Sequence, residues 1–164
     1  MTLTAKRLKE LVRYDPITGF FTWAKGRRGC RAGDTAGRRR PEDGYWQVML
    51  DGKQYYYQRL AVLYMTGRWP AEEADHKSTD KDDHTWENIR QATYSQNQQN
   101  KPKQSNNTSG YKGVTWNSQH KKWFARISVS GKRHHLGYFA DPIKAHKAYC
   151  RAANEFHKQF ARVA

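Results

Sequence analysis

The sequence has 164 residues, of which 30 are Lys or Arg and 15 are Asp or Glu, so the formal charge is +15 and the pI is about 10.0. This length fits one ordinary domain or two small ones, and the positive charge predicts a polyanionic partner, above all nucleic acid. No long apolar run, basic amphipathic helix or signal peptide stands out, so we expect an intracellular protein that does not bind membranes. The two cysteines, Cys30 and Cys150, indicate neither a disulfide framework nor a structural zinc site.

The first hundred residues predict short helices and strands. Residues 4–13 place Leu8, Leu11 and Val12 at helical spacing, and the Asp15-Pro16 step should end that helix because a residue before proline avoids the α region. Aromatic runs bounded by glycines then predict strands, and an apolar run predicts a buried helix stopped by Gly67. The predicted strands are residues 19–23, 44–50 and 53–58, with an Asp51-Gly52 hairpin turn between the last two, and the predicted helix is residues 59–67.

A basic, glycine-rich run extends from Lys25 to Arg40, between the first two of those strands. Such a composition is more typical of a mobile arm than of a packed element. We therefore expect this run to project from the domain.

The polar stretch QNQQNKPKQSNNT, residues 96–108, has the composition of a flexible connector. We predict a first module over residues 1–97, a linker over residues 98–108 and a second module over residues 109–164. The second module carries most of the charge, because residues 1–100 hold 17 basic and 13 acidic residues, whereas residues 101–164 hold 13 and 2.

Three strand-like runs open the second module: GYKGVTW, KKWFARISVSG and KRHHLGYF. Their short polar turns predict a three-stranded antiparallel sheet. Asp141-Pro142 then resembles an N-cap followed by proline at the first helical position, with an apolar stripe beyond it. We expect one helix packed on a small sheet.

Asp75-His76 lies in the polar segment ADHKSTDKDDHTWENIR, residues 74–90. Phosphodiester hydrolysis needs a base, a cation and ligands for that cation, and an acid beside an imidazole can supply a ligand and the base. If residues 86–90 form the antiparallel partner of a strand ending at His76, Asn88 returns towards this histidine. A capping box at residues 93–96 predicts a following helix with Asn97 in its first turn.

These residues resemble the HNH nuclease family, specifically the homing endonucleases of phages and introns. The resemblance lies in D-H at 75–76, W-E-N-I-R at 86–90 and S-Q-N-Q-Q-N at 95–100. It implies a ββα-metal fold, one Mg²⁺ or Mn²⁺ ion held by Asp75 and Asn97, His76 as the general base and Asn88 orienting it. For a phage-encoded member, the compartment would be the cytoplasm of an infected bacterial host.

The sequence departs from that family beside the site. Gln58 precedes Arg-Leu where relatives have histidine, and K-S-T-D at 77–80 replaces I-N-G-D, which removes an apolar residue and a turn glycine. A solvated surface turn is the alternative interpretation of the segment. We expect His84 to face solvent. We expect the same of the acids Asp80, Asp82 and Asp83, because the spacing, glycine and distal glutamate of a calcium-binding EF-hand are missing.

From Gly110 the sequence resembles the plant Apetala/ethylene-responsive-factor DNA-binding domain, over about 50 residues. The resemblance lies in Y-K-G-V at 111–114, K-W-F-A-R-I at 122–127, L-G-Y-F at 136–139 and A-Y-C-R-A-A at 148–153. It implies that the sheet enters the DNA major groove while Trp123, Ile127 and Leu136 face the helix. The matching groove-facing set is Lys112, Thr115, Arg126, Ser128, Arg133 and His135.

The sequence thus predicts an α+β protein, a ββα-metal nuclease module followed by a small three-stranded antiparallel sheet packed on one helix. We expect a DNA endonuclease with one divalent ion, of the phage homing or nicking type, docked on double-stranded DNA by its C-terminal module. A catalytically decayed, sequence-preferring DNA-binding protein is the alternative. RNA binding is disfavoured because no single-strand stacking motif is matched.

Overall fold

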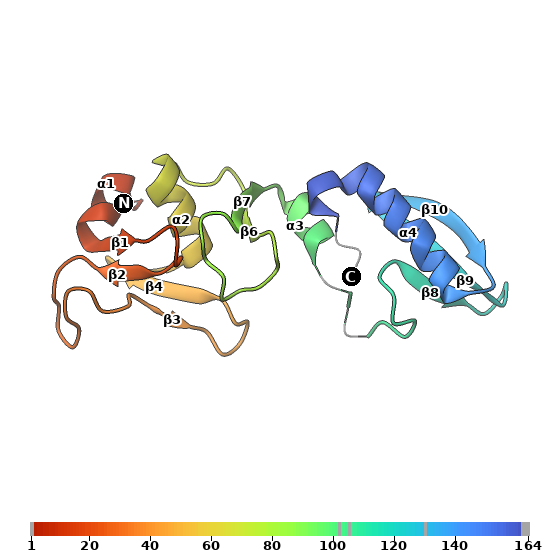
Figure 1. Ribbon diagram of the computed structural model, residues 1–164, viewed down its shortest axis with the longest axis horizontal. Helices are drawn as coiled ribbons and strands as arrows, with labels where there is room; N and C mark the ends of the chain where they lie inside the picture. The colour runs from red at the N-terminus through yellow and green to blue at the C-terminus, as the bar shows by residue number, and fades with distance from the viewer. Residues whose placement is uncertain (1, 102, 105, 130, 162–164) are drawn as a thin grey trace. The chain divides into compact units, whose positions relative to one another are not determined.

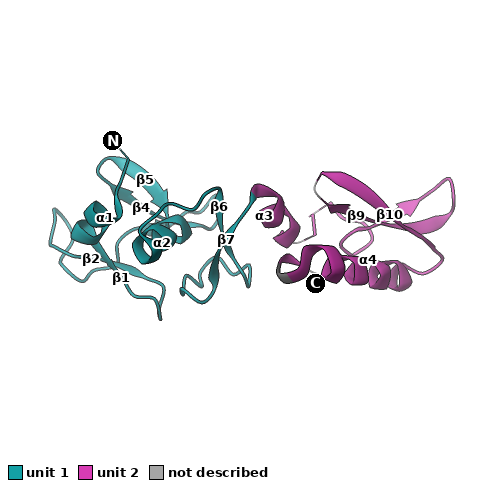
Figure 2. Ribbon diagram, turned by 90° about the horizontal axis from the view of Figure 1, so that it is seen from above, with its two compact units in different colours: residues 1–93 teal, residues 94–164 magenta. Residues whose placement is uncertain are grey.

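The computed structural model describes residues 2–101, 103–104, 106–129 and 131–161. The chain divides into two compact units, Met1–Thr93 and Tyr94–Ala164, coloured separately in Figure 2. Positions 102 and 105 of the predicted linker, and positions 130 and 162–164 of the predicted second module, lie outside the described residues.

From residue 2 onward, unit 1 combines two helices with three small antiparallel sheets, β1-β2, β3-β4-β5 and β6-β7 (Figure 1). In chain order the elements are α1 (Ala5–Leu11), β1 (Val12–Tyr14), β2 (Phe21–Trp23), β3 (Arg38–Arg39), β4 (Trp46–Leu50), β5 (Lys53–Tyr56), α2 (Tyr57–Thr66), β6 (Glu73–His76) and β7 (Ile89–Ala92).

The core of unit 1 forms around α2, which contacts α1, β4, β5, β6 and β7. The side chains of Tyr57, Leu60 and Val62 on this helix are fully buried. The helix ends at Gly67 in the left-handed conformation, as predicted. The Asp51-Gly52 turn is also confirmed, since both residues have positive φ and join β4 to β5.

The first helix is shorter than predicted. It ends at Leu11, and Val12 instead begins β1, which pairs with β2. Val12 is fully buried in that position. Val12 could be buried either in a longer helix or in a strand paired with β2. The pairing with β2 favours the strand.

The basic run from Lys25 to Arg40 is packed against unit 1 and is not a projecting arm. It returns along β2 through a bridge between Thr22 and Thr35, and Arg38–Arg39 forms β3. Ala36 is fully buried, and its carbonyl accepts a hydrogen bond from the Tyr57 hydroxyl. The prediction from composition was wrong because backbone pairing and one buried alanine anchor the run, while its cations point outward.

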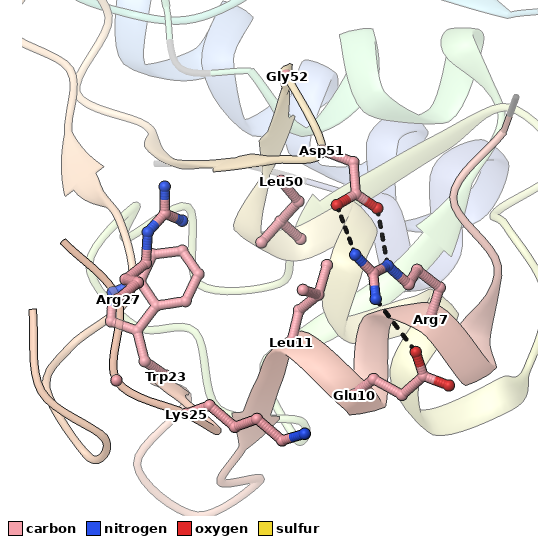
Figure 3. Close-up of a pocket in the computed structure, with 10 residues that line it drawn as sticks. Arg7, Glu10, Leu11, Trp23, Lys25, Arg27, Leu50, Asp51 and Gly52 are labelled. Carbon is pink, nitrogen blue, oxygen red and sulfur yellow. Dashed lines mark hydrogen bonds and ion pairs between the residues drawn. The ribbon is translucent and has the colours of Figure 1, made fainter.

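A pocket of about 490 Å³ lies between α1, the basic run and the β4–β5 turn (Figure 3). Arg7 forms ion pairs there with Asp51 at 3.0 Å and Glu10 at 3.2 Å. Arg27 lies over the Trp23 ring at 4.4 Å. None of the predicted site residues lines this pocket.

The described residues of unit 2 form two α-helices, a three-stranded sheet and a short 3-10 helix. In chain order these are α3 (Tyr94–Asn100), β8 (Val114–Asn117), β9 (Lys122–Val129), β10 (Lys132–Phe139), α4 (Pro142–His157) and η1 (Lys158–Phe160). Residues 98–100, expected to begin the linker, belong to α3.

The sheet of unit 2 is antiparallel, in the order β10-β9-β8, and α4 packs along it (Figure 1). Asp141 caps α4 by accepting a hydrogen bond from the Ile143 amide, and Pro142 occupies the first turn, as predicted. Ile127 packs against Tyr149 and Ala153 of the helix, with Leu136 alongside. The architecture is therefore the predicted α+β fold, with a small sheet packed on one helix.

Within the described ranges, no helix has both the length and the apolar character needed to cross a membrane.

Candidate active site

The Asp75-His76 pair lies at the end of β6, which is antiparallel to β7. Asp75 is opposite Arg90 in this hairpin, and His76 is opposite Ile89. The segment that ends in W-E-N-I-R therefore returns beside Asp75-His76, as predicted, but residues 86–88 form a turn and the strand is Ile89–Ala92 instead of 86–90. Helix α2 packs against both strands, which buries the end of the hairpin.

Asp75 is 8% exposed, and its carboxylate accepts two hydrogen bonds from one guanidinium. Arg90 donates from Nε at 3.1 Å and from Nη2 at 2.9 Å, both to Oδ2. Bonds of this kind between charged groups are the strong class of protein hydrogen bond, so they fix the orientation of the carboxylate. A cation bound by Asp75 would share this carboxylate with Arg90.

His76 is 3% exposed and lies among aromatic rings. Its Nε2 is 3.2 Å from Nδ1 of His84, and the Tyr45 ring lies 6.2 Å away, centroid to centroid. Burial lowers the pKa of His76 from its ordinary value, although the carboxylate of Asp75 acts in the opposite direction. A lowered pKa keeps the imidazole neutral near pH 7, which is the form that can accept a proton.

His84 is fully buried, contrary to the expectation that it faces solvent. The rings of Phe20, Trp46 and Tyr57 surround it, with centroid distances between 4.9 and 6.1 Å. The prediction failed because it relied on the charged residues next to His84 in the sequence. The neighbours of His84 in space come instead from β4, α2 and the segment before β2.

The backbone of His84 is held against the segment between β1 and β2. The Tyr14 hydroxyl donates a hydrogen bond to the His84 carbonyl at 2.7 Å. A Cβ added at Gly19, whose φ is +77°, would lie 2.2 Å from the His84 carbonyl carbon. Glycine is therefore required at this position by both its conformation and the close approach.

The Asn88 side chain binds the loop that connects β6 to β7. Its Nδ2 donates to the Asp83 carbonyl at 2.7 Å, and its Oδ1 accepts from the Ser78 amide at 2.8 Å. The predicted orienting bond from Asn88 to the imidazole is not among these two. In this structure Asn88 fixes the loop, and His84 is a hydrogen-bond partner of His76 that sequence reasoning missed.

Asn97 lies in the first turn of α3, as predicted, and is half-buried. This helix belongs to unit 2, where the Lys112 ammonium donates to the carbonyls of Gln99 and Lys101 at 2.6 Å each. A cation at the C-terminal end of a helix satisfies carbonyls that lack intrahelical partners.

The predicted ligands have the chemistry of a magnesium or manganese site. Across the described residues, no three His, Cys, Asp or Glu side chains form a metal-binding group. Asp75 and Asn97 would offer one carboxylate and one amide oxygen, both hard donors. Mg²⁺ is commonly held by so few protein ligands, because water and phosphate oxygens complete its coordination.

Five residues of the predicted DNA-binding set are exposed on one face of the unit 2 sheet. The register pairs Arg133 with Ser128 and His135 with Arg126, and Thr115 lies opposite Phe124. Residues opposite each other across paired strands share a face, and α4 covers the other face. Lys112, the sixth residue, is half-buried beside α3.

A cluster of rings on the same face was not predicted. The Phe124 ring stacks on His135 at 4.9 Å and packs against Tyr138 at 5.3 Å, and His120 adds a further contact at 4.5 Å from Tyr138. An irregularity in the register between His135 and Gly137 brings Tyr138 opposite Phe124. Strand alternation places Phe124 on this face, but only the irregularity places Tyr138 there.

Comparison with known proteins places two families on this chain. Residues 55–99 match the HNH endonuclease family model, and residues 109–159 match the AP2 domain model. Protein 3.8 of Escherichia phage T7 is 32% identical over 76 residues, which is 46% of this chain and 62% of the phage protein. The chain thus spans less than two thirds of this curated relative.

No solved structure gives a significant match. The HNH match covers α2, the β6–β7 hairpin and most of α3, and the AP2 match covers the sheet and α4. In order along the chain, the protein therefore carries an HNH endonuclease module and an AP2 domain.

Proposed function

We propose that this protein is a divalent-metal-dependent DNA endonuclease of the phage homing or nicking type, which acts inside a bacterial host. The observation that carries the proposal is the buried His76 beside Asp75 on a paired hairpin, within the segment that matches the HNH endonuclease model. The similarity to a phage T7 protein supports the phage setting.

In the proposed reaction His76 is the general base. It removes a proton from a water molecule as the water oxygen forms a bond to phosphorus, and one ester P–O bond breaks. The leaving oxygen takes a proton from solvent. The lowered pKa of His76 supports this role, because an imidazole already protonated at neutral pH could not accept the proton.

Asp75 and Asn97 are proposed to hold one Mg²⁺ or Mn²⁺ ion, which when bound would neutralise negative charge on the reacting phosphate. Arg90 fixes the Asp75 carboxylate through its two hydrogen bonds. Asn88 is proposed to hold the loop of the hairpin and so the end of β6 that carries His76.

The AP2 domain is proposed to dock the enzyme on double-stranded DNA through the exposed face of its sheet. Residues 101–164 carry 13 basic and 2 acidic residues, a density that favours release of counterions from DNA. Arg126 and Arg133 on that face are the groups suited to phosphate or guanine contacts. Lys112, Thr115, Ser128 and His135 complete the proposed contact set.

A non-catalytic DNA-binding protein is the second candidate. The observations that favour it are the low exposure of His76, 3%, and of Asp75, 8%, together with the Arg90 guanidinium on the carboxylate. An enzyme would need both side chains to become accessible when DNA binds. A protein that only binds DNA has no such requirement. Metal-dependent cleavage of a plasmid by the purified protein distinguishes the candidates.

The mutation that tests the endonuclease proposal is His76→Ala. We expect cleavage in the presence of Mn²⁺ to fall by about 10²- to 10⁴-fold, because a positioned general base contributes about that much, while the affinity for DNA stays unchanged. His134→Ala is the matched control, since His134 is an exposed histidine on β10 that stacks on Phe156 of α4. Wild-type cleavage by His76→Ala would exclude the proposed base.

A further inference from the structure

His84 is a buried imidazole for which neither family resemblance supplies a role. Its side chain is 0% exposed, and Nδ1 is 3.2 Å from Nε2 of His76. Its other nitrogen, Nε2, is buried and has no hydrogen-bond partner within the described part of the chain. A buried polar atom without a partner is costly, so its presence here calls for a physical explanation.

A hydrogen bond between two neutral imidazoles requires one nitrogen to carry the proton and the other to accept. Burial lowers the pKa of His84 to about 4, so this imidazole is neutral at physiological pH. Two arrangements remain. Either His76 Nε2–H donates to His84 Nδ1, or His84 Nδ1–H donates to His76 Nε2.

The surroundings of His84 favour the first arrangement. In it, the proton of His84 is on the buried Nε2, and the rings of Phe20, Trp46 and Tyr57 form a cage around the imidazole, with centroids 4.9 to 6.1 Å from it. An N–H group can interact with the negative face of an aromatic ring. In the second arrangement Nε2 would hold a lone pair, which the negative face of a ring does not attract. We therefore take Nδ1 of His84 as the acceptor in this pair.

This choice fixes the proton on His76 as well. If His76 Nε2 carries the hydrogen and donates it to His84, the lone pair of the His76 imidazole is on Nδ1. We propose that His84 is a positioning residue that holds the His76 ring in one orientation and one tautomer, so that Nδ1 is the atom that accepts the proton from water. This inference rests on the proposed role of His76 as the general base.

The support for His84 is rigid enough for this task. The Tyr14 hydroxyl binds its carbonyl, and Gly19 packs directly against its backbone. The Asp83 carbonyl next to it is bound by Asn88. A side chain held by both its backbone and an aromatic cage loses little further entropy when it orients a neighbour.

A matched pair of substitutions tests the proposal in the full-length protein. Asn and Leu have nearly the same shape and truncate the ring equally, but only Asn places an acceptor oxygen near the position of Nδ1. We expect His84→Asn to keep kcat within a few-fold of wild type and His84→Leu to lower kcat by about 10- to 100-fold with KM unchanged. Thermal unfolding of both variants measures the loss of stability that each suffers because a smaller side chain replaces the His84 ring. Equal kcat for the two variants would overturn the proposal.

The imidazole ¹⁵N resonances of His76 provide a readout that does not depend on activity. They are assigned by comparison with His76→Gln. We expect a protonated, pyrrole-type Nε2 and an unprotonated, pyridine-type Nδ1 in the wild type and in His84→Asn, and a mixture of tautomers in His84→Leu. A wild-type His76 with the proton on Nδ1 would refute the inference.

These outcomes are distinguishable from failure of the proposed function. If His76→Ala cleaves DNA normally, the general base is wrong, whatever His84 does. If His76→Ala is inactive but His84→Leu matches His84→Asn in both kcat and tautomer, the endonuclease proposal stands and the role of His84 is refuted.

Discussion

Residues His76 and His84 lie in a similar polar sequence context, and both are buried. Desolvation lowers the pKa of both, and for His84 the neighbouring His76 lowers it further. A neutral pair can share one hydrogen without a net charge in the core. Burial therefore favours the neutral form of both imidazoles, which the proposed base chemistry requires of His76.

The depressed pKa of His84 predicts a stability that depends on pH. The folded state holds this imidazole neutral down to pH of about 4, whereas an unfolded histidine takes up a proton near its ordinary value of 6.5. The unfolded state thus binds more protons between these values, so the free energy of unfolding falls as pH is lowered from 6.5 to 4. The loss should be roughly 3 kcal/mol, measured by urea denaturation across that range.

His84→Leu is the control for this dependence, because it removes the titrating group. Its free energy of unfolding should vary less between pH 6.5 and 4 than that of the wild type, with the remainder arising from other groups such as His76 and His157, whose pKa values are also lowered. The same slope in both proteins would show that His84 is not the origin of the acid sensitivity.

The loop that joins β6 to β7 begins with a tight turn at Thr79. Thr79 adopts a φ of +67°, in the position where relatives have the turn glycine, and its amide donates to the His76 carbonyl at 3.0 Å. The turn is thus kept without its glycine. A β-branched residue in the left-handed region is strained, by about 1–2 kcal/mol relative to its ordinary conformations.

Thr79→Gly should therefore stabilise the protein. Relief of the strain exceeds the added conformational entropy of glycine in the unfolded chain, so we expect a gain of about 0.5–1 kcal/mol in thermal or urea unfolding. Glu87→Gly is the matched control in the same loop, because Glu87 is exposed and is not among the residues with positive φ. It should destabilise, and stabilisation by both changes would point to a loop that prefers flexibility.

The basic run from Lys25 to Arg40 is an element whose packing composition alone predicted wrongly. Its cations are exposed apart from the half-buried Arg40, as the sequence indicated, but its backbone pairs with β2 and β4. Arg39 also forms an ion pair with Asp82 at 3.0 Å, which links the run to the loop of the hairpin. Composition reports the solvated side chains, and the pairing depends on a partner strand that is not adjacent in sequence.

For the molecule as a whole, the charge of the AP2 domain should dominate the salt dependence of DNA binding. Arg133→Gln should weaken binding to all duplex sequences and reduce the slope of log K against log salt concentration by about one, because one phosphate contact releases about one counterion. The slope is measured by fluorescence anisotropy over a range of salt concentrations.

Lys147→Gln is the matched control for this measurement. Lys147 is an exposed cation on α4, the helix that packs on the opposite face of the sheet. It should leave the slope unchanged. Equal effects from the two substitutions would show that net charge alone, and not the exposed sheet face, binds DNA.

Local sequence determined the two-module order, the α+β class, the hairpin that carries Asp75-His76 and the strands of the second module. Those features depend on side-chain periodicity, turn residues and short motifs, which are local in the chain. Tertiary structure alone decided the burial of His84, its bond to His76, the loop contacts of Asn88 and the packing of the basic run. The physical reason is that burial is set by neighbours in space, and the rings around His84 come from positions 20, 46 and 57, far from it along the chain.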